Sequence, residues 1–243
     1  MAPLAPARRR PRSPRPAPDA PAGPLPNPFP PSDPAWVPPP PHRRDAPVAH
    51  GVPCSLRDFL DRYGSPAGVE WVDGFTHDKP VVSNRHQSIC AFLYDALRDR
   101  VRADGDAGQV RFNGQDLLVP RPDDGEIVRL RHPDVCAMLD RDDPRVVADG
   151  WLGCDVCVEV ISPDDPRRDT VQKRAEYAAA GVAEYWLVDP RPPIRRLPAG
   201  RTVSILSLAG GEYTGEPVGD GGAAESLLLP GLRFDVTACL DAV

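Results

Sequence analysis

Two carboxylates and one lysine stand out in this chain because of the segments that carry them. Asp134 opens one predicted strand, Glu159 lies inside a second, and Lys173 lies on the helix that follows the second strand. If the two strands are neighbours, the carboxylates meet at one end of a sheet and can bind one Mg²⁺ or Mn²⁺ ion. The ion would lower the pKa of a bound water and neutralise charge that builds on a phosphate, and the lysine could hold that water or phosphate. These residues therefore suit metal-assisted chemistry on a phosphate group.

Glu159 is the most informative of the three because of its surroundings. It interrupts the apolar, β-branched run 153–162, which is typical of a strand buried on both faces of a sheet. An unpaired carboxylate there is costly, so a partner or a function is expected. Because side chains alternate along a strand, Glu159 shares a face with Asp155, Cys157 and Ile161. Glu159 could be half of a structural ion pair, but its position favours a metal ligand.

The segments after this strand predict a β-α-β unit. Residues 162–166 form a turn by composition, a helix runs from about 169 to 180, and a strand follows at 184–188. Asp169 is expected at the helix N-cap and Gly181 just beyond the last turn. Lys173 follows Asp169 by four residues on one stripe, so the two can simply pair with each other. Parallel strands joined by a right-handed crossover are the default for such a unit.

The remaining segments are expected to surround this unit. His86 lies in the first turn of the clearest helix, 84–102, and is expected to start that helix rather than to act in catalysis. Tyr177 and Trp186 are expected to be core aromatics. The other predicted elements are a helix at 55–61, a hairpin with an Asp-Gly turn at 69–75, strands at 110–120 and 127–139, strands at 194–197, 202–208 and 211–214 as a peripheral meander, and final segments at 226–230 and 232–236.

Charge and proline content divide the chain in two. The first fifty residues hold 18 of the 33 prolines and carry seven Arg against three Asp. This composition cannot bury enough apolar surface to fold, so residues 1–50 are expected to be a disordered tail. Because the whole chain has a net charge of −6 and the tail +4, residues 51–243 carry −10. The tail lacks the apolar core of a secretory signal, and no segment is long enough to span a membrane.

The six cysteines are scattered, and several lie in apolar runs. They are expected to be buried free thiols in a reducing compartment, which indicates a cytoplasmic protein. Cys154 and Cys157 have the spacing of a zinc or redox motif. Three residues apart on one strand, however, their sulfurs should lie on opposite faces, and no second Cys/His pair completes a tetrahedral site. A zinc or redox function therefore ranks last.

The order and spacing of several motifs resemble a known family. Pro133-Asp134 and Glu159 match the acidic residues of the PD-(D/E)xK nucleases, although Ile161 stands where the lysine is expected and Lys173 would replace it from the helix. More specifically, the chain is similar to the Uma2 family, also called DUF820, of restriction endonuclease-like proteins. The matching segments are 69–74, 86–89, 133–135, 159–163 with Asp169, Lys173 and Tyr177, 181–190 and 226–232.

This resemblance covers about residue 55 to the C-terminus and implies both a fold and an activity. The implied fold is α/β: a restriction-endonuclease-like core in residues 51–243, with a central mixed β-sheet flanked by helices and a peripheral C-terminal β-meander. The implied activity is that of a divalent-metal-dependent endonuclease on nucleic acid, foremost DNA, and the implied assembly is a homodimer. Asp134 and Glu159 would be Mg²⁺ or Mn²⁺ ligands, Lys173 the catalytic lysine, and Glu70 either a further ligand or half of a surface ion pair. One departure is Phe75, which stands where the family usually has Glu.

A second hypothesis is a catalytically inactive nuclease fold that serves as a binding or regulatory module. The charge of −10 on residues 51–243 favours it, because non-specific duplex binding needs a basic surface. A local basic patch could still suffice for the nuclease. The arginines expected near the site are Arg129, Arg131, Arg167, Arg168 and Arg174.

Overall fold

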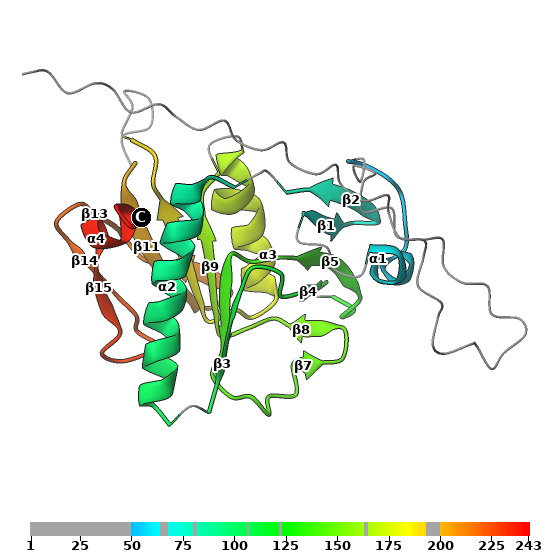
Figure 1. The fold of residues 1–243 in the computed structure, drawn as a ribbon. Helices are drawn as coiled ribbons and strands as arrows, with labels where there is room; N and C mark the ends of the chain where they lie inside the picture. The colour runs from blue at the N-terminus through cyan, green and yellow to red at the C-terminus, as the bar shows by residue number, and fades with distance from the viewer. Residues whose placement is uncertain are drawn as a thin grey trace, which may run out of the picture. The chain divides into compact units, whose positions relative to one another are not determined.

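A computed structural model describes residues 50–63, 68–79, 82–105, 107–121, 123–162, 165–192 and 200–243 (Figure 1). The predicted tail, apart from His50, and the predicted strand at 194–197 lie outside these residues. The described residues form a mixed α/β fold that belongs to one unit, 41–243. No described helix combines the length and the apolar character that crossing a membrane would require.

The larger sheet has the β-α-β unit at its centre. Strands β9 and β10 are parallel, as predicted, and the other neighbouring pairs are antiparallel. Strand β11 extends this sheet beyond β10, because it pairs with every residue of β10. The order is β12-β11-β10-β9-β6-β3 with β13 on β11, and the bounds are β3 Gln109–Phe112, β6 Val135–Met138, β9 Val156–Val160, β10 Glu184–Asp189, β11 Thr202–Ala209, β12 Glu212–Thr214 and β13 Pro217–Gly219.

A second sheet holds the predicted hairpin at its edge. Asp73 and Gly74 both have positive φ values, 49° and 89°, as a two-residue hairpin turn requires. The strand order is β2-β1-β5-β4-β8-β7, and the bounds are β1 Val69–Val72, β2 Phe75–Asp78, β4 Leu117–Pro120, β5 Ile127–Arg131, β7 Val146–Val147 and β8 Gly150–Leu152.

Two long strands predicted from the sequence are each divided between the sheets. The segment 110–120 turns at Asn113 and Gly114, whose φ values are 46° and 94°, so β3 and β4 belong to different sheets. The segment 127–139 is likewise divided into β5 and β6. Pro133 lies at this break, where a residue without an N–H group cannot continue the ladder. The break places Asp134 directly before β6, which is the neighbour of β9.

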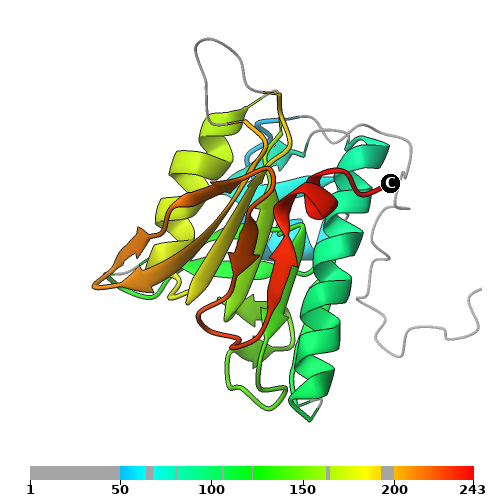
Figure 2. The same ribbon diagram turned by 90° about the vertical axis from the view of Figure 1, so that its left-hand side faces the viewer.

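Helices cover both faces of the seven-stranded sheet (Figure 2). Helix α2 packs Ile89 and Leu93 against Val158 on one face, and α3 packs Tyr177 against Cys157 on the other. Tyr177 and Trp186 are fully buried, as predicted. The helices are α1 Leu56–Tyr63, α2 Asn84–Ala103, the π-helix η1 Arg168–Lys173, α3 Arg174–Ala179 and α4 Val236–Leu240; a small sheet pairs β14 Ala223–Glu225 with β15 Arg233–Asp235.

The helix after β9 differs from its prediction at its start. Asp169 is not the N-cap; it lies inside η1, where its carboxylate is buried and contacts Lys173. The end of the helix is as predicted, because Gly181 follows the C-cap residue with a φ of 71°. A π-helical turn inside a helix is rare and is frequently found at functional sites.

The prediction for Cys154 and Cys157 is wrong in its geometry. Strand β9 begins only at Val156, and Cys154 precedes it after Gly153, whose φ is 81°. The turn brings Cys154 to the face that carries Cys157, and both thiols pack in one apolar cluster with Tyr177. Both are fully buried and free, and burial raises the pKa of each thiol. They are core residues, as expected, although they share one face.

Candidate active site

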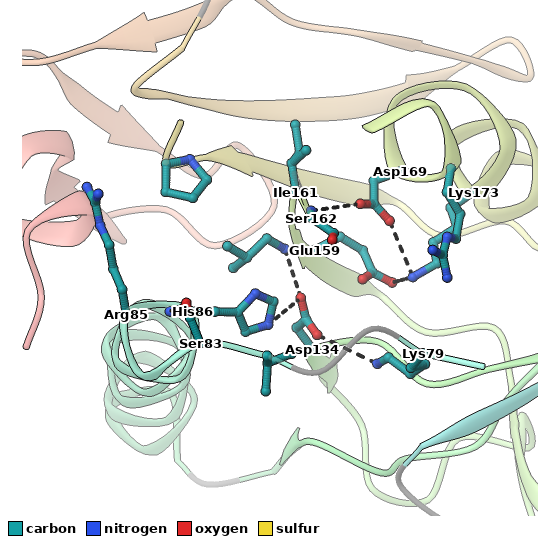
Figure 3. Close-up of a pocket in the computed structure, with 14 residues that line it drawn as sticks. Lys79, Ser83, Arg85, His86, Asp134, Glu159, Ile161, Ser162, Asp169 and Lys173 are labelled. Carbon is teal, nitrogen blue, oxygen red and sulfur yellow. Dashed lines mark hydrogen bonds and ion pairs between the residues drawn. The ribbon is translucent and has the colours of Figure 1, made fainter. Parts of the chain in front are cut away.

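A cavity of about 160 Å³ lies where β9 ends, between the first turn of α2 and the π-helix η1 (Figure 3). Its floor contains three buried acids and one buried lysine, and it extends to exposed residues at the start of α2. The side chains that line it are Lys79, Val82, Ser83, Arg85, His86, Asp134, Glu159, Val160, Ile161, Ser162, Arg168, Asp169, Lys173 and Pro190. The structure thus brings Asp134, Glu159 and Lys173 to one cavity.

Asp134 is fixed by the strand next to it. Its Oδ2 atom accepts a hydrogen bond from the backbone N–H of Val160 at 2.9 Å, and this bond holds the carboxylate at the end of β9. The Nε2 atom of His86 lies 3.2 Å from the same oxygen, and Nζ of Lys79 lies 3.7 Å from Oδ1. Burial opposes ionisation, but the contact with His86 and the charges of Lys79 and Lys173 lower the pKa of Asp134 to about 2. Asp134 is therefore a carboxylate at neutral pH.

Glu159 reaches the cavity from the α3 face of the sheet. Its Oε1 atom accepts a hydrogen bond from the Tyr177 hydroxyl at 2.6 Å and lies 2.8 Å from Nζ of Lys173. Burial raises the pKa of Glu159 to about 7; Lys173 opposes this rise, and the charges of Asp134 and Asp169 add to it. The Glu159 carboxylate would therefore be stabilised by a further cation in the cavity.

Lys173 is surrounded by acidic side chains. Its Nζ atom lies 2.8 Å from Glu159, 3.4 Å from Asp169 and 3.8 Å from Glu70. Burial alone would lower the pKa of Lys173, but these three carboxylates raise it, so the side chain stays charged. The simple alternative, a solvated lysine that pairs only with Asp169, does not describe this environment.

Glu70 lies behind Lys173 and does not line the cavity. It is fully buried in β1, where Oε2 accepts from Nη1 of Arg131 at 2.8 Å and Oε1 accepts from the backbone N–H of His132 at 3.1 Å. Despite its burial, the charges of Lys173 and Arg131 lower the pKa of Glu70. Both oxygens thus have donors, and the structure places Glu70 as a support for Lys173 rather than as a half of a surface ion pair.

Several residues at the cavity were not predicted from the sequence. Lys79 follows the hairpin and reaches the floor, where its Nζ atom also donates to the His132 carbonyl at 2.6 Å. Arg85 stands at the exposed edge and donates to the Leu240 carbonyl. His86 points at Asp134, although its position in the first turn suggested only a helix start. The hairpin and the C-terminal helix meet the site only in the folded chain, so no local pattern could reveal these contacts.

The predicted arginine patch is largely elsewhere. Arg129 and Arg131 bind Glu176 on α3, and Arg174 donates to the carbonyl of Tyr213. Of the five predicted arginines, only Arg168 lines the cavity. The basic side chains around the carboxylates are therefore Lys79, Arg85, Arg168 and Lys173.

The residues present fit a hydrated divalent ion. Among the described residues, neither Oδ1 of Asp134 nor Oε2 of Glu159 accepts a hydrogen bond, so each carboxylate keeps one oxygen for another ligand. The cavity of about 160 Å³ greatly exceeds the ~10–15 Å³ that one water molecule needs, so it has room for an ion together with water. Carboxylate oxygens with water are the ligands that Mg²⁺ and Mn²⁺ prefer.

Comparisons with other proteins identify the fold and the family of this chain. The fold is nuclease-like: it is similar to the crystal structure of a protein from Anabaena variabilis ATCC 29413 that is described as a putative nuclease belonging to DUF820. The TM-score is 0.55 at 15% sequence identity, over 74% of this chain and 96% of that one. The model of the Uma2 family, described as "putative restriction endonuclease", matches residues 56–237, so the chain belongs to the Uma2 family. Among curated proteins, no sequence matches the chain.

Proposed function

We propose that this protein is a divalent-metal-dependent endonuclease that hydrolyses phosphodiester bonds of nucleic acid, with DNA as its main substrate. The observation that carries the proposal is the convergence of Asp134, Glu159 and Lys173 in one cavity, from three elements far apart in the chain. Membership of a restriction endonuclease family and a nuclease-like fold support it. The ion would be Mg²⁺ or Mn²⁺, and the homodimer inferred from the family resemblance stays a prediction.

Each side chain of the cavity has a definable part in this reaction. Asp134 and Glu159 would hold the ion, which when bound supplies positive charge and a more acidic water. Lys173 presents its ammonium group beside Glu159, where it can hold a water or a phosphate oxygen. The Tyr177 hydroxyl fixes the Glu159 carboxylate from behind. Glu70 and Asp169 keep Lys173 charged and in place.

The basic residues at the edge of the cavity suit a phosphate backbone. Lys79, Arg85 and Arg168 line it beside the carboxylates, so they can orient an incoming strand. This local positive charge offsets, at the site, the charge of −10 on residues 51–243. We expect binding that weakens as salt is added, because phosphate contacts release counterions.

A cleavage assay tests the proposal directly. Purified protein is incubated with single-stranded, duplex and branched DNA and RNA, with Mg²⁺ or Mn²⁺ or with a chelator. We expect cleavage that needs the ion and that falls by at least ~10³-fold in Asp134→Asn and Glu159→Gln. Asp155→Asn is the matched control, because Asp155 bonds the N–H of Leu139 and Arg145 outside the cavity. Cleavage that survives in both site variants would refute the assigned site.

The inactive binding module remains the second candidate, favoured by the acidic charge of residues 51–243. It predicts that the wild-type protein cuts no substrate in the panel with either ion. Any binding of nucleic acid that it shows should be unchanged in Glu159→Gln. Binding by fluorescence anisotropy, measured beside the cleavage assay, separates the two functions.

A further inference from the structure

His86 has an environment that a helix-start residue does not need. Its Nε2 atom is shielded from solvent and, among the described residues, has no hydrogen-bond partner of acceptable geometry. Figure 3 shows the ring directed at the carboxylate of Asp134, and the distance from Nε2 to Oδ2 is 3.2 Å. The N-cap of α2 is supplied by Ser83, whose hydroxyl accepts from the backbone N–H of His86. The imidazole is therefore not used in capping.

A third donor lies one turn further along α2. Ligand atoms of His86, Cys90 and Asp134 all lie within 4.8 Å of one another, a spacing that one metal ion could satisfy. Cys90 is fully buried in the apolar core beneath α2, whereas His86 lines the cavity. The imidazole is thus the donor that an ion entering from the cavity would meet together with Asp134.

We propose that His86 is a nitrogen ligand of the ion bound by Asp134, and that the resident ion is therefore Mn²⁺ rather than Mg²⁺. The inference rests on the proposed function and narrows its cofactor. Imidazole binds Mn²⁺ and later transition metals, whereas Mg²⁺ keeps oxygen ligands and water. With His86 as a ligand, the first turn of α2 would take a direct part in ion binding, together with the two strands that also border the cavity. Lys79, on the other side of Asp134, would remain for the phosphate.

Pulsed electron paramagnetic resonance of Mn²⁺-loaded full-length protein tests the ligand without any need for cleavage. A coordinated imidazole gives ¹⁴N modulation of the Mn²⁺ echo. We expect this modulation in the wild type and in His77→Gln, and its loss in His86→Gln. His77 is a matched control because it lies on β2 and does not line the cavity. If His86→Gln fails to fold, ¹⁵N-histidine labelling of the wild type gives the same answer, because His86 is the only histidine among the described lining residues.

Calorimetric titration supplies the second measurement. We expect His86→Gln to weaken Mn²⁺ binding by at least about tenfold, because even residues that only support a metal ligand contribute that much to metal affinity. Its effect on Mg²⁺ binding should be small. Mn²⁺ that binds through Asp134 without nitrogen modulation would overturn the inference and leave the proposed nuclease intact. No binding of either ion to the wild type would overturn both.

Cys90 gives a further way to overturn the inference. A Co²⁺-substituted protein with a thiolate charge-transfer band that disappears in Cys90→Ser would show a sulfur ligand. Stoichiometric Zn²⁺ held by that sulfur would then replace Mn²⁺ as the resident ion. Absence of the band, with ¹⁴N modulation from Mn²⁺, supports the assignment made here.

Discussion

Neighbouring strands of the larger sheet each bury one glutamate, and the two differ in what surrounds them. Glu184 lies at the start of β10, where its carboxylate accepts four hydrogen bonds, from Trp186 Nε1, the Ser226 hydroxyl and the N–H groups of Leu227 and Leu228. Glu159 lies near the end of β9, where it contacts one hydroxyl and one ammonium group, and its other oxygen accepts no hydrogen bond from the described residues. The hydrogen-bonding capacity of the Glu184 carboxylate is satisfied within the fold, whereas the Glu159 carboxylate can still bind a cation.

The contrast shows that burial of a carboxylate does not by itself identify a site. Both glutamates are almost fully buried, with 1% and 2% of the residue exposed. What separates them is the number of donors and whether a cation can still enter. Glu184 anchors the 226–229 turn and so stabilises the fold, whereas Glu159 holds its charge beside Asp134 and Asp169. This difference should be measurable in the free energy of unfolding.

The largest effect is expected at Glu184. Glu184→Ala leaves four donors without their acceptor, two of them buried, and should lower the free energy of unfolding by about 4 kcal/mol. Glu159→Gln should change it by only about 1 kcal/mol, because the amide removes a charge that neighbouring carboxylates disfavour. Urea denaturation followed by circular dichroism measures both, and Glu184→Gln, which keeps one acceptor, should fall between them. Equal losses for the two glutamates would remove the contrast.

The second largest effect on the free energy of unfolding is expected at Lys173. Lys173→Met leaves Glu159, Asp169 and Glu70 without their shared cation, and should lower the free energy of unfolding by about 3 kcal/mol. Combining it with Glu159→Gln should recover part of this loss, because the two residues interact and their effects are not additive. A double-mutant cycle by urea denaturation gives the coupling. Strict additivity would mean that the pair does not interact as its 2.8 Å separation implies.

Divalent ions should raise the free energy of unfolding by binding at Asp134 and Glu159, and not at Glu184. At a hundredfold excess over its Kd, an ion bound only by the native state adds ~2.7 kcal/mol to the free energy of unfolding. Thermal denaturation should show this gain in the wild type and in Glu184→Gln, and its absence in Asp134→Asn. An equal gain in Asp134→Asn would place the ion elsewhere.

The smallest effect is expected at Tyr177. Tyr177→Phe removes the hydroxyl that donates to Glu159 but keeps the ring packed against Tyr185, at a centroid distance of 5.3 Å. The free energy of unfolding should fall by about 1 kcal/mol. Cleavage should fall far less than in Glu159→Gln, because the hydroxyl only orients the carboxylate. A loss of cleavage as large as that of Glu159→Gln would give Tyr177 a direct part in the reaction.

Local patterns predicted the parts of the fold that depend on local physics. The spacing of Ile89, Leu93 and Leu97 gave α2, the Asp73-Gly74 pair gave the hairpin, and the apolar run around Glu159 gave the buried strand and its parallel partner. The convergence of the two carboxylates followed from placing their strands side by side. These predictions needed only periodicity, turn chemistry and the default topology of a β-α-β unit.

Several errors involve partners distant in sequence, whereas those at Cys154 and Asp169 arise from local backbone geometry. The choice of sheet for each half of 110–120 and 127–139 depends on strands elsewhere. The apolar pattern concealed the turn at Asn113 and Gly114, whereas Pro133 correctly indicated the break before Asp134. Asp169 has the composition of an N-cap residue, but Lys173 and the π-helical turn draw it into the site. Lys79 and His86 reach Asp134 from opposite directions, across 55 and 48 residues of chain. Sequence position alone carries no sign of such meetings.

Arg131 has a consequence for how natural variants of this family should be interpreted. It is buried at the end of β5, where Nη1 donates to Glu70 on β1 and the guanidinium makes a two-point contact with Glu176 on α3. We expect a change at Arg131, Glu70 or Glu176 to displace Lys173, because Glu70 contacts the lysine on the side away from the cavity. None of these three residues lines the cavity. A survey that scores only cavity-lining positions would therefore miss variants that displace Lys173 through these contacts.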